Sequence, residues 1–174
     1  MEKVGLPADA STLIYLAKAE AFEMAWRCVG RLTIPPSVWR ESVEAGERRG
    51  AVEVARIRWA HEKGLVIRVP LSSSTARRAR EIADRFLLGS GESEVLALGR
   101  RGGRVIVDEG RATRVAESLG LVPISTLLLP VLGATRGRLT ERSAIAMLHR
   151  VASATGARAD VTFLLEQLIR RNPR

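Results

Sequence analysis

The chain has 174 residues, a formal net charge of +9 and a hydrophobic fraction of 46%. This length suits one compact domain over residues 1–174, and the apolar fraction is large enough for a core. The single cysteine, Cys28, excludes an internal disulfide framework. No stretch approaches the roughly 18 uncharged residues of a membrane span, and no signal peptide is recognisable, so we expect a cytoplasmic protein.

Basic residues are spread along the chain and gather locally at residues 77–80, 100–104 and 170–171. Such a charge balance attracts polyanions and makes their binding dependent on salt. An equally good explanation is a GC-rich genome that favours arginine codons, since lysine is scarce. The charge therefore favours a nucleic-acid partner without identifying one.

Short β-branched runs alternate with longer helical patterns, which is typical of an α/β fold with a parallel sheet. Five strands are predicted, one ending near residues 7–8 and the others over residues 31–34, 65–69, 105–107 and 121–124. Helices are predicted from about residue 11, twice between residues 36 and 63, and then over residues 72–87, 90–98, 111–119, 126–136, 140–153 and 160–171. Gly5 and Pro7 predict that the first strand is short or irregular.

Four acidic residues occupy positions where such a fold places its chemistry. Asp9 comes just after the first strand, and Asp108 directly follows the strand at residues 105–107. Ligands of open parallel sheets bind at the carboxyl ends of the strands. Glu41 and Glu92 lie on helices, each beside an apolar stripe that should face the core. We therefore expect these four carboxylates to converge in one strongly negative pocket.

A pocket of this kind requires a cation. Mg²⁺ prefers hard oxygen ligands and keeps several water molecules, so carboxylates and substrate phosphate oxygens suit it. A bound ion of this kind activates water for hydrolysis and stabilises the departing oxygen. An acidic, metal-loaded pocket inside a basic surface is therefore suited to cleaving a nucleic acid.

Each acid also has an explanation that needs no metal. Asp9 could cap the helix that begins near Ser11, and Glu92 could stabilise a helix N-terminus through the helix dipole. Glu41 could be a solvated helix residue, and Asp108 could cap the helix that follows it. Taken one at a time, these residues do not distinguish the two explanations.

Four segments, in the same order, resemble PIN-domain ribonucleases, especially a branch related to the VapC-type toxins. They are an Asp-Ala-Ser step followed by an apolar helix ending in Ala-Lys, a Pro-x-x-Val-x-x-Glu segment, a Gly-x-Gly-Glu segment, and a strand that ends in an acidic pair. These segments occupy residues 9–18, 34–41, 89–98 and 105–112.

The resemblance implies a three-layer α/β/α fold with a roughly five-stranded parallel sheet and a site that binds Mg²⁺ or Mn²⁺. The metal ligands and catalytic residues it implies are Asp9, Glu41, Glu92 and Asp108. Glu109 stands where the branch often has a second Asp, which implies an auxiliary metal ligand. Ser11 and Arg111 are implied to orient ligands or to contact phosphate, whereas Glu94 is interpreted as a surface or salt-bridging acid.

The resemblance further implies a Mg²⁺-dependent endoribonuclease that acts on RNA, extending to the toxin of a toxin–antitoxin pair. A small acidic antitoxin and a second copy of the chain are then the expected protein partners, with residues 127–132 as a candidate dimer face or as part of the core. The alternative is a non-catalytic RNA-binding or protein-interaction module that kept the fold, against which the retention of all four acids argues.

Other enzyme classes fit poorly. A phosphoaspartyl enzyme of the haloacid-dehalogenase type needs a second Asp where Ser11 stands, and no Walker lysine follows a glycine-rich loop. Cys28, His61 and His149 are isolated from one another, which argues against a zinc site and against a Cys/His nucleophile.

Overall fold

The computed structural model describes residues 5–99 and 103–171. Arg100 and Arg101, which belong to one of the predicted basic clusters, lie outside these residues. Within them, no helix combines the length and the apolar character needed to cross a membrane.

The strands are short and all run parallel, as predicted. They are β1 (Leu6–Pro7), β2 (Leu32–Ile34), β3 (Val66–Arg68), β4 (Arg104–Ile106) and β5 (Val122–Ile124). β2 pairs with both β1 and β3, and β4 pairs with β5. A parallel bridge between Ala8 and Ile106 joins the two groups, so the strands lie in the order β5-β4-β1-β2-β3. The order of the strands therefore reverses between β1 and β4. Open parallel sheets bind their ligands in the crevice at such a point.

The first strand is as short as Gly5 and Pro7 predict. Proline cannot donate a ladder hydrogen bond, so Pro7 contributes no N–H to the pairing. A side chain at position 5 would place its Cβ only 2.6 Å from the carbonyl oxygen of Arg31, so only glycine allows the two chains to approach this closely. The pairing resumes one residue later, where the Ala8 N–H donates to Thr33 and the Asp9 N–H to Ile106.

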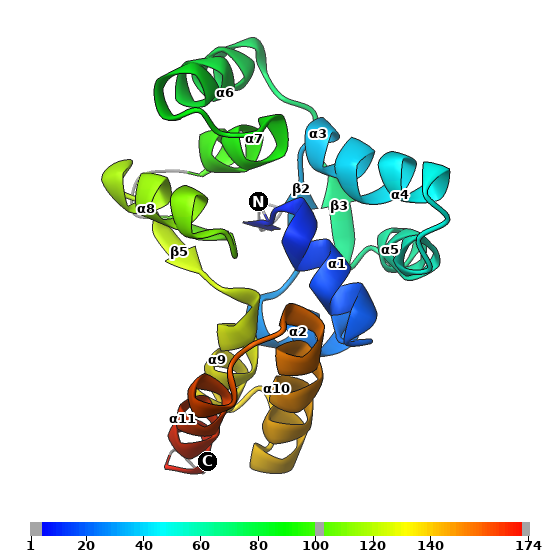
Figure 1. Cartoon of the computed structure of the whole chain (residues 1–174), viewed down its shortest axis with the longest axis vertical. Helices are drawn as coiled ribbons and strands as arrows, with labels where there is room; N and C mark the ends of the chain where they lie inside the picture. Colours follow the sequence, from blue (N-terminus) through cyan, green and yellow to red (C-terminus); the bar gives the residue numbers. More distant parts are fainter. Residues whose placement is uncertain (1–4, 100–102, 172–174) are drawn as a thin grey trace.

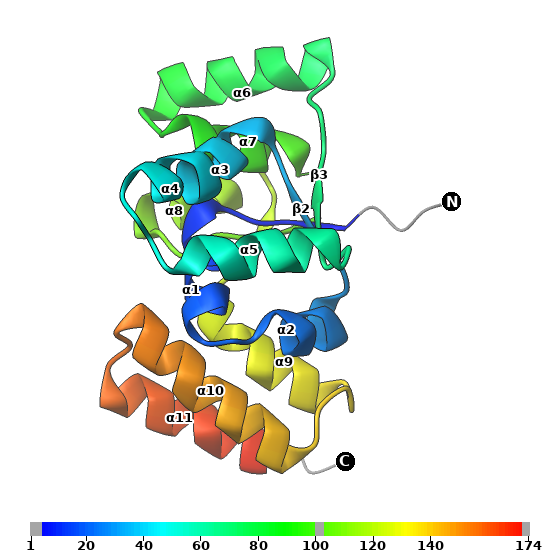
Figure 2. The ribbon, with the colours of Figure 1, turned by 90° about the vertical axis from the view of Figure 1, so that its right-hand side faces the viewer.

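Helices surround the sheet, and Figure 1 shows α6 and α7 at one end of the molecule, α9, α10 and α11 at the other, and α8 on one flank. They are α1 (Ala10–Lys18), α2 (Phe22–Val29), α3 (Pro36–Trp39), the π-helical turn η1 (Arg40–Glu44), α4 (Ala45–Arg48), α5 (Glu53–Glu62), α6 (Ser73–Phe86), α7 (Ser90–Leu98), α8 (Gly110–Ser118), the 3₁₀ turn η2 (Thr126–Leu128), α9 (Leu129–Thr135), α10 (Glu141–Thr155) and α11 (Ala159–Arg170). In the turned view of Figure 2, α10 and α11 lie side by side, separated from the strands by α1, α2 and α9.

Two features depart from the expected element boundaries. Residues 22–29 form a separate helix, α2, which the sequence patterns did not identify, and Glu20 in a left-handed conformation makes the turn before it. The stretch at residues 127–132 is mainly core, because Leu129 and Pro130 are buried while Leu128 is exposed. The most exposed apolar side chains near the carboxyl end belong instead to α11, at Phe163 and Leu164.

Candidate active site

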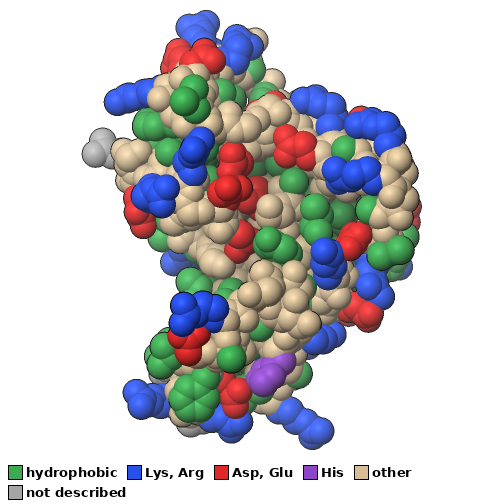
Figure 3. Space-filling view, viewed as in Figure 1, with side chains coloured by type: hydrophobic (Ala, Val, Ile, Leu, Met, Phe, Trp, Pro, Cys, Tyr) green, Lys and Arg blue, Asp and Glu red, His purple; other side chains and the backbone are tan. Residues whose placement is uncertain are grey.

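A polar hollow of about 160 Å³ opens at the carboxyl ends of β1 and β4. Its walls come from segments that are far apart in the chain, namely the start of α1, the η1 turn, the start of α7 and the residue before α8. The residues that line it are Asp9, Ala10, Ser11, Glu41, Gly89, Gly91, Glu92 and Glu109. The space-filling view in Figure 3 shows a cluster of acidic side chains at the centre of this face, with Lys and Arg side chains beside it.

Asp9 forms the floor of the hollow and is only 4% exposed. Its Oδ1 accepts hydrogen bonds from the backbone N–H of Thr12 (2.8 Å) and from the Thr12 hydroxyl (2.7 Å), so it caps α1. Its Oδ2 accepts only a long bond, at 3.4 Å, from the backbone N–H of Asp108. Burial raises the pKa of Asp9 to about 6, and the Asp108 charge adds to this effect although the hydrogen bonds from Thr12 oppose it.

Asp108 lies behind Asp9 and is half-buried, without lining the hollow itself. Its Oδ1 accepts from the Ser125 hydroxyl and the Thr126 N–H, both at 2.8 Å, and its Oδ2 accepts from the Thr126 hydroxyl at 2.5 Å. Its carboxylate therefore holds the chain where it leaves β5. The Thr12 hydroxyl also lies 3.3 Å from Oδ2, so one side chain contacts both aspartates.

Glu41 reaches the hollow from η1 and meets the N-terminus of α7. Its Oε1 accepts from the Ser90 hydroxyl (3.2 Å) and from the Gly91 N–H (3.1 Å). A Cβ on residue 91 would lie 2.5 Å from Glu41 Oε2, so glycine at this position leaves the room that the carboxylate occupies. The Gly-x-Gly-Glu segment thus has a steric role toward a residue 50 positions earlier in the chain.

Glu92 is half-buried in the first turn of α7, where its Oε2 accepts from the Gly89 N–H at 3.1 Å. Glu92 therefore stabilises the N-terminus of α7, as the explanation without a metal expects, and does so through a hydrogen bond to one of its two carboxylate oxygens. Burial raises the pKa of Glu92, and the charges of Glu109 and Glu41 raise it further. Glu92, Glu109 and Glu41 therefore repel one another across the hollow.

The structure also places the auxiliary residues of the sequence analysis. Ser11 and Glu109 line the hollow, with Glu109 exposed at its edge. Arg111 donates from Nη1 to the carbonyl oxygen of Leu87 at 3.2 Å, and its charge opposes the rise in the pKa of Glu92. Glu94 does not face the hollow, because it accepts from both the N–H and the hydroxyl of Ser37 and so caps α3.

Sequence reasoning missed four residues near the site. Thr12, Ser125 and Thr126 bind the two aspartates, and Tyr15 is close enough to Asp108, Asp9 and Glu109 for their charges, together with burial, to raise its pKa. The position of Tyr15, one helical turn after Ser11, could have identified it. Nothing in the sequence pairs residues 125 and 126 with Asp108, because that contact depends on how β4 and β5 align.

The comparison with known families agrees with this architecture. A profile described as a PIN domain matches residues 8–171, which is nearly the whole chain. The chain belongs to the PIN-domain family. PIN domains are generally nucleases that act on nucleic acids and typically use divalent metals. Searches of curated proteins and of solved structures gave no match.

The donor atoms of this PIN domain suit a hard divalent cation, since the hollow gathers carboxylate and hydroxyl oxygens without nitrogen or sulfur side chains. In the described parts of the chain, no three acidic, His or Cys side chains are already arranged to hold an ion. The carboxylates are instead held by neutral donors such as Ser90, Gly91 and Gly89. Metal binding would therefore require these side chains to rearrange.

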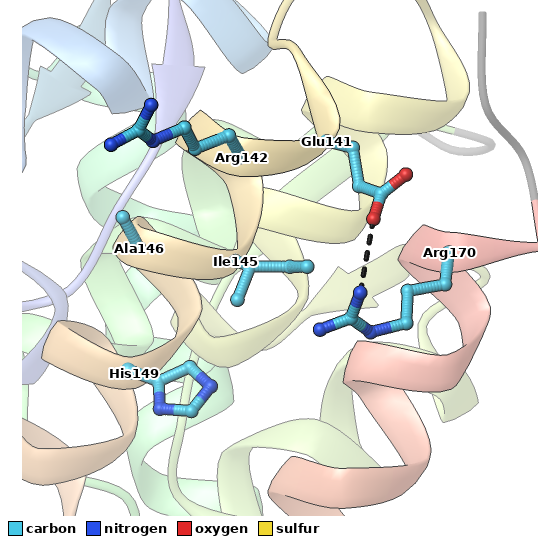
Figure 4. Close-up of a pocket in the computed structure, with 6 residues that line it drawn as sticks. All are labelled: Glu141, Arg142, Ile145, Ala146, His149 and Arg170. Carbon is cyan, nitrogen blue, oxygen red and sulfur yellow. Dashed lines mark hydrogen bonds and ion pairs between the residues drawn. The ribbon is translucent and has the colours of Figure 1, made fainter.

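A larger hollow of about 520 Å³ lies between α10 and α11, remote from the acids of the PIN-domain site. Figure 4 shows its lining, Glu141, Arg142, Ile145, Ala146, His149 and Arg170, with an ion pair of 3.2 Å between Arg170 and Glu141 across it. Its apolar floor and paired charges offer no cluster of carboxylates. Its size alone therefore does not make it the candidate active site.

Proposed function

We propose that this PIN domain is an endoribonuclease that depends on Mg²⁺ or Mn²⁺. One observation carries the proposal. None of Asp9, Glu41, Glu92, Asp108 and Glu109 forms an ion pair with any described residue, although the chain carries a net charge of +9. These carboxylates are held by neutral donors, and the charge of Arg111 offsets only part of the rise in the pKa of Glu92, so a divalent cation that joins them would be strongly favoured.

The hydrogen bonds of the site acids support a division of roles among them. Asp9, Glu41 and Glu92 line the hollow, and one oxygen of each accepts a hydrogen bond from a backbone N–H. With the edge residue Glu109 they would hold the ion, and Asp108 would join them as a ligand by releasing a hydrogen bond from Ser125 or Thr126. A bound divalent ion supplies Lewis acidity, which makes a water molecule a better nucleophile and stabilises the departing oxygen. Ser11 and Arg111 would orient the RNA phosphate beside these oxygens.

A suitable test of the proposed function is cleavage of a single-stranded RNA by wild-type protein and the Glu41→Gln variant. Glu41 is exposed, and Gln keeps an oxygen for Ser90 and Gly91, so the fold should be retained. We expect cleavage to require Mg²⁺ or Mn²⁺, to stop in EDTA, and to fall by at least about 100-fold in the variant. Asp108→Asn is a less suitable probe, because Asp108 also holds Ser125 and Thr126.

The alternative function is also decided by this experiment. RNA binding without cleavage in any metal would support the non-catalytic RNA-binding module. Cleavage of equal rate in Mg²⁺, in EDTA and in the Glu41→Gln variant would refute the metal-dependent mechanism.

Two partners are part of the proposal. The first is a small acidic antitoxin, supported by the net charge and by the basic side chains beside the acidic cluster. If the protein is a toxin, producing it alone should arrest growth, and co-expression of an open reading frame adjacent to its gene should relieve the arrest. Arrest that no neighbouring frame relieves would argue against this role.

The second partner is another copy of the chain, docked on α11. Phe163 and Leu164 of this helix are 60% and 63% exposed, which is unusual for such large apolar side chains. The charges at the two ends of α11, on Asp160 and Arg170, already pair within the chain, so the two apolar side chains carry this part of the proposal. Light scattering at micromolar concentration should give the mass of a dimer, and a monomer mass would exclude it.

A further inference from the structure

The turn between α6 and α7 contains an unusual residue, Leu87. Its backbone adopts the left-handed conformation, with a φ of 53°, and its side chain is 78% exposed. Helices commonly end in this conformation, but the residue there is usually glycine, because a side chain makes it unfavourable. Its exposed side chain also gains little of the free energy that burial of a leucine provides. Folding alone would be served better by glycine at this position.

Leu87 contrasts with its neighbour and with a similar residue elsewhere. Leu88 is buried and packs in the hydrophobic core, so it anchors the turn. Glu20 is the other non-glycine residue in the described chain with a positive φ, and its carboxylate forms an ion pair with Arg56. The side chain of Glu20 therefore has a partner within the fold, whereas that of Leu87 is directed to solvent.

The contacts of the turn place Leu87 at the edge of the acidic hollow. Gly89, two residues later, lines the hollow, and Leu87 accepts a hydrogen bond from Arg111. Arg111 in turn follows the hollow-lining Glu109 by two residues. The backbone of this turn is thus hydrogen-bonded to the start of α8, and the exposed side chain of Leu87 lies two residues before the hollow-lining Gly89.

We propose that Leu87 is a substrate-binding residue whose side chain packs against the face of an unpaired nucleobase next to the scissile phosphate. This inference rests on the proposed ribonuclease function and adds to it a residue that recognises an unpaired base. Unpaired bases offer apolar faces that stack on apolar and aromatic side chains, whereas bases inside a duplex do not. Strained residues that the surrounding structure fixes are frequently found at binding sites.

The decisive variant is Leu87→Gly, because glycine relieves the backbone strain while it removes the side chain. We expect its melting temperature to equal or exceed that of the wild type. The KM for a fluorescently labelled single-stranded RNA should rise roughly 10-fold with kcat little changed, since binding of one apolar side chain is lost. Leu87→Met, which keeps an apolar side chain, should recover most of the affinity.

The matched control is Glu20→Gly, which changes the other left-handed residue at a site remote from the hollow. We expect this variant to leave KM unchanged. The dissociation constant of each variant is also measured in Ca²⁺ or EDTA with single-stranded RNA and with a duplex of the same sequence. The effect of Leu87→Gly should be confined to the single-stranded RNA.

The possible outcomes separate the inference from the function on which it rests. An unchanged KM and an unchanged dissociation constant in Leu87→Gly would overturn the inference while leaving the ribonuclease intact. A lowered melting temperature with a proportionate loss of active protein would also overturn it, because it would show a structural role. If the wild type lacks metal-dependent cleavage, the proposed function fails, and the dissociation constants alone decide whether Leu87 contacts RNA.

Discussion

The hollow at the carboxyl ends of β1 and β4 and the hollow between α10 and α11 hold their carboxylates in opposite electrostatic settings. Between α10 and α11, Glu166 pairs with His149 at 2.8 Å and with Arg170 at 2.6 Å, and Arg170 pairs with Glu141. These contacts, the hydrogen bond from Arg170 first, lower the pKa of Glu166. At the strand ends, burial instead raises the pKa of Asp9 and of Glu92.

This contrast shows why the smaller hollow is the better candidate active site of the PIN domain. A carboxylate that is already neutralised by a neighbouring cation has little to gain from a ligand. A carboxylate that is buried among other acids is destabilised when charged, so a cation that binds it is strongly favoured. The charge environment, rather than the 520 Å³ of the larger hollow, is therefore the basis for choosing the candidate active site.

The largest predicted effect concerns Asp9, whose ionisation should make the stability of the folded protein depend on pH. Its pKa is about 6 in the folded protein against 3.8 ordinarily, so the folded state binds more protons between about pH 4 and 6. Stability is therefore lost as pH rises through this range, by about 3 kcal/mol. We expect metal-free wild type to lose that much more stability from pH 4 to 7 than Asp9→Asn, as measured by urea unfolding.

Urea unfolding in the presence of Mg²⁺ tests whether a cation relieves the cost of the buried Asp9 charge. Asn retains the cap on α1 but cannot ionise, so the ion should stabilise the wild type at pH 7 and have little effect on Asp9→Asn. Identical pH profiles for the two proteins without metal would show that the Asp9 charge carries no such cost.

The next largest effects are predicted for two glycine substitutions, one at the candidate active site and one in the hydrophobic core. Gly91→Ala would place a Cβ 2.5 Å from Glu41 Oε2, whereas Gly133→Ala would place one 2.5 Å from the Sγ of buried Cys28. The first should displace Glu41 and lower kcat/KM roughly 10- to 100-fold with little change in stability. The second should cost about 1–3 kcal/mol of stability through overpacking and leave the activity of the folded fraction unchanged.

Melting curves and cleavage rates of the two glycine variants decide this prediction. A fully active Gly91→Ala protein would mean that Glu41 does not need its observed position.

The smallest effect is expected between α10 and α11. Glu166→Gln removes the charge that pairs with His149 and Arg170, but exposed ion pairs contribute little to stability. We expect nearly unchanged melting temperature and unchanged cleavage, in contrast to Glu41→Gln. A loss of cleavage comparable to that of Glu41→Gln would mean that both hollows are needed for activity, and would contradict the difference drawn between them.

Local patterns were sufficient for much of the fold. The β-branched run before Asp108 and the helical repeats predicted the parallel strands and most helices, and Gly5 and Pro7 predicted the short β1. The helix α2 was not identified, because the left-handed turn at Glu20 carries no glycine to mark it. Asp9 and Asp108 were each placed after a strand, and the bridge between Ala8 and Ile106 is what brings them together.

The sequence by itself determined the family, the parallel α/β fold and the identity of the acids at strand and helix ends, because these follow from short-range periodicity and residue type. Only the tertiary structure decided which oxygens are committed to Thr12, Ser125 and Thr126, since those bonds join segments up to 96 residues apart. It also decided that Leu87 stands exposed at the rim and that the site acids lack ion pairs with described residues. The physical reason is that burial and charge neutralisation depend on neighbours in space, which residue spacing along the chain does not specify.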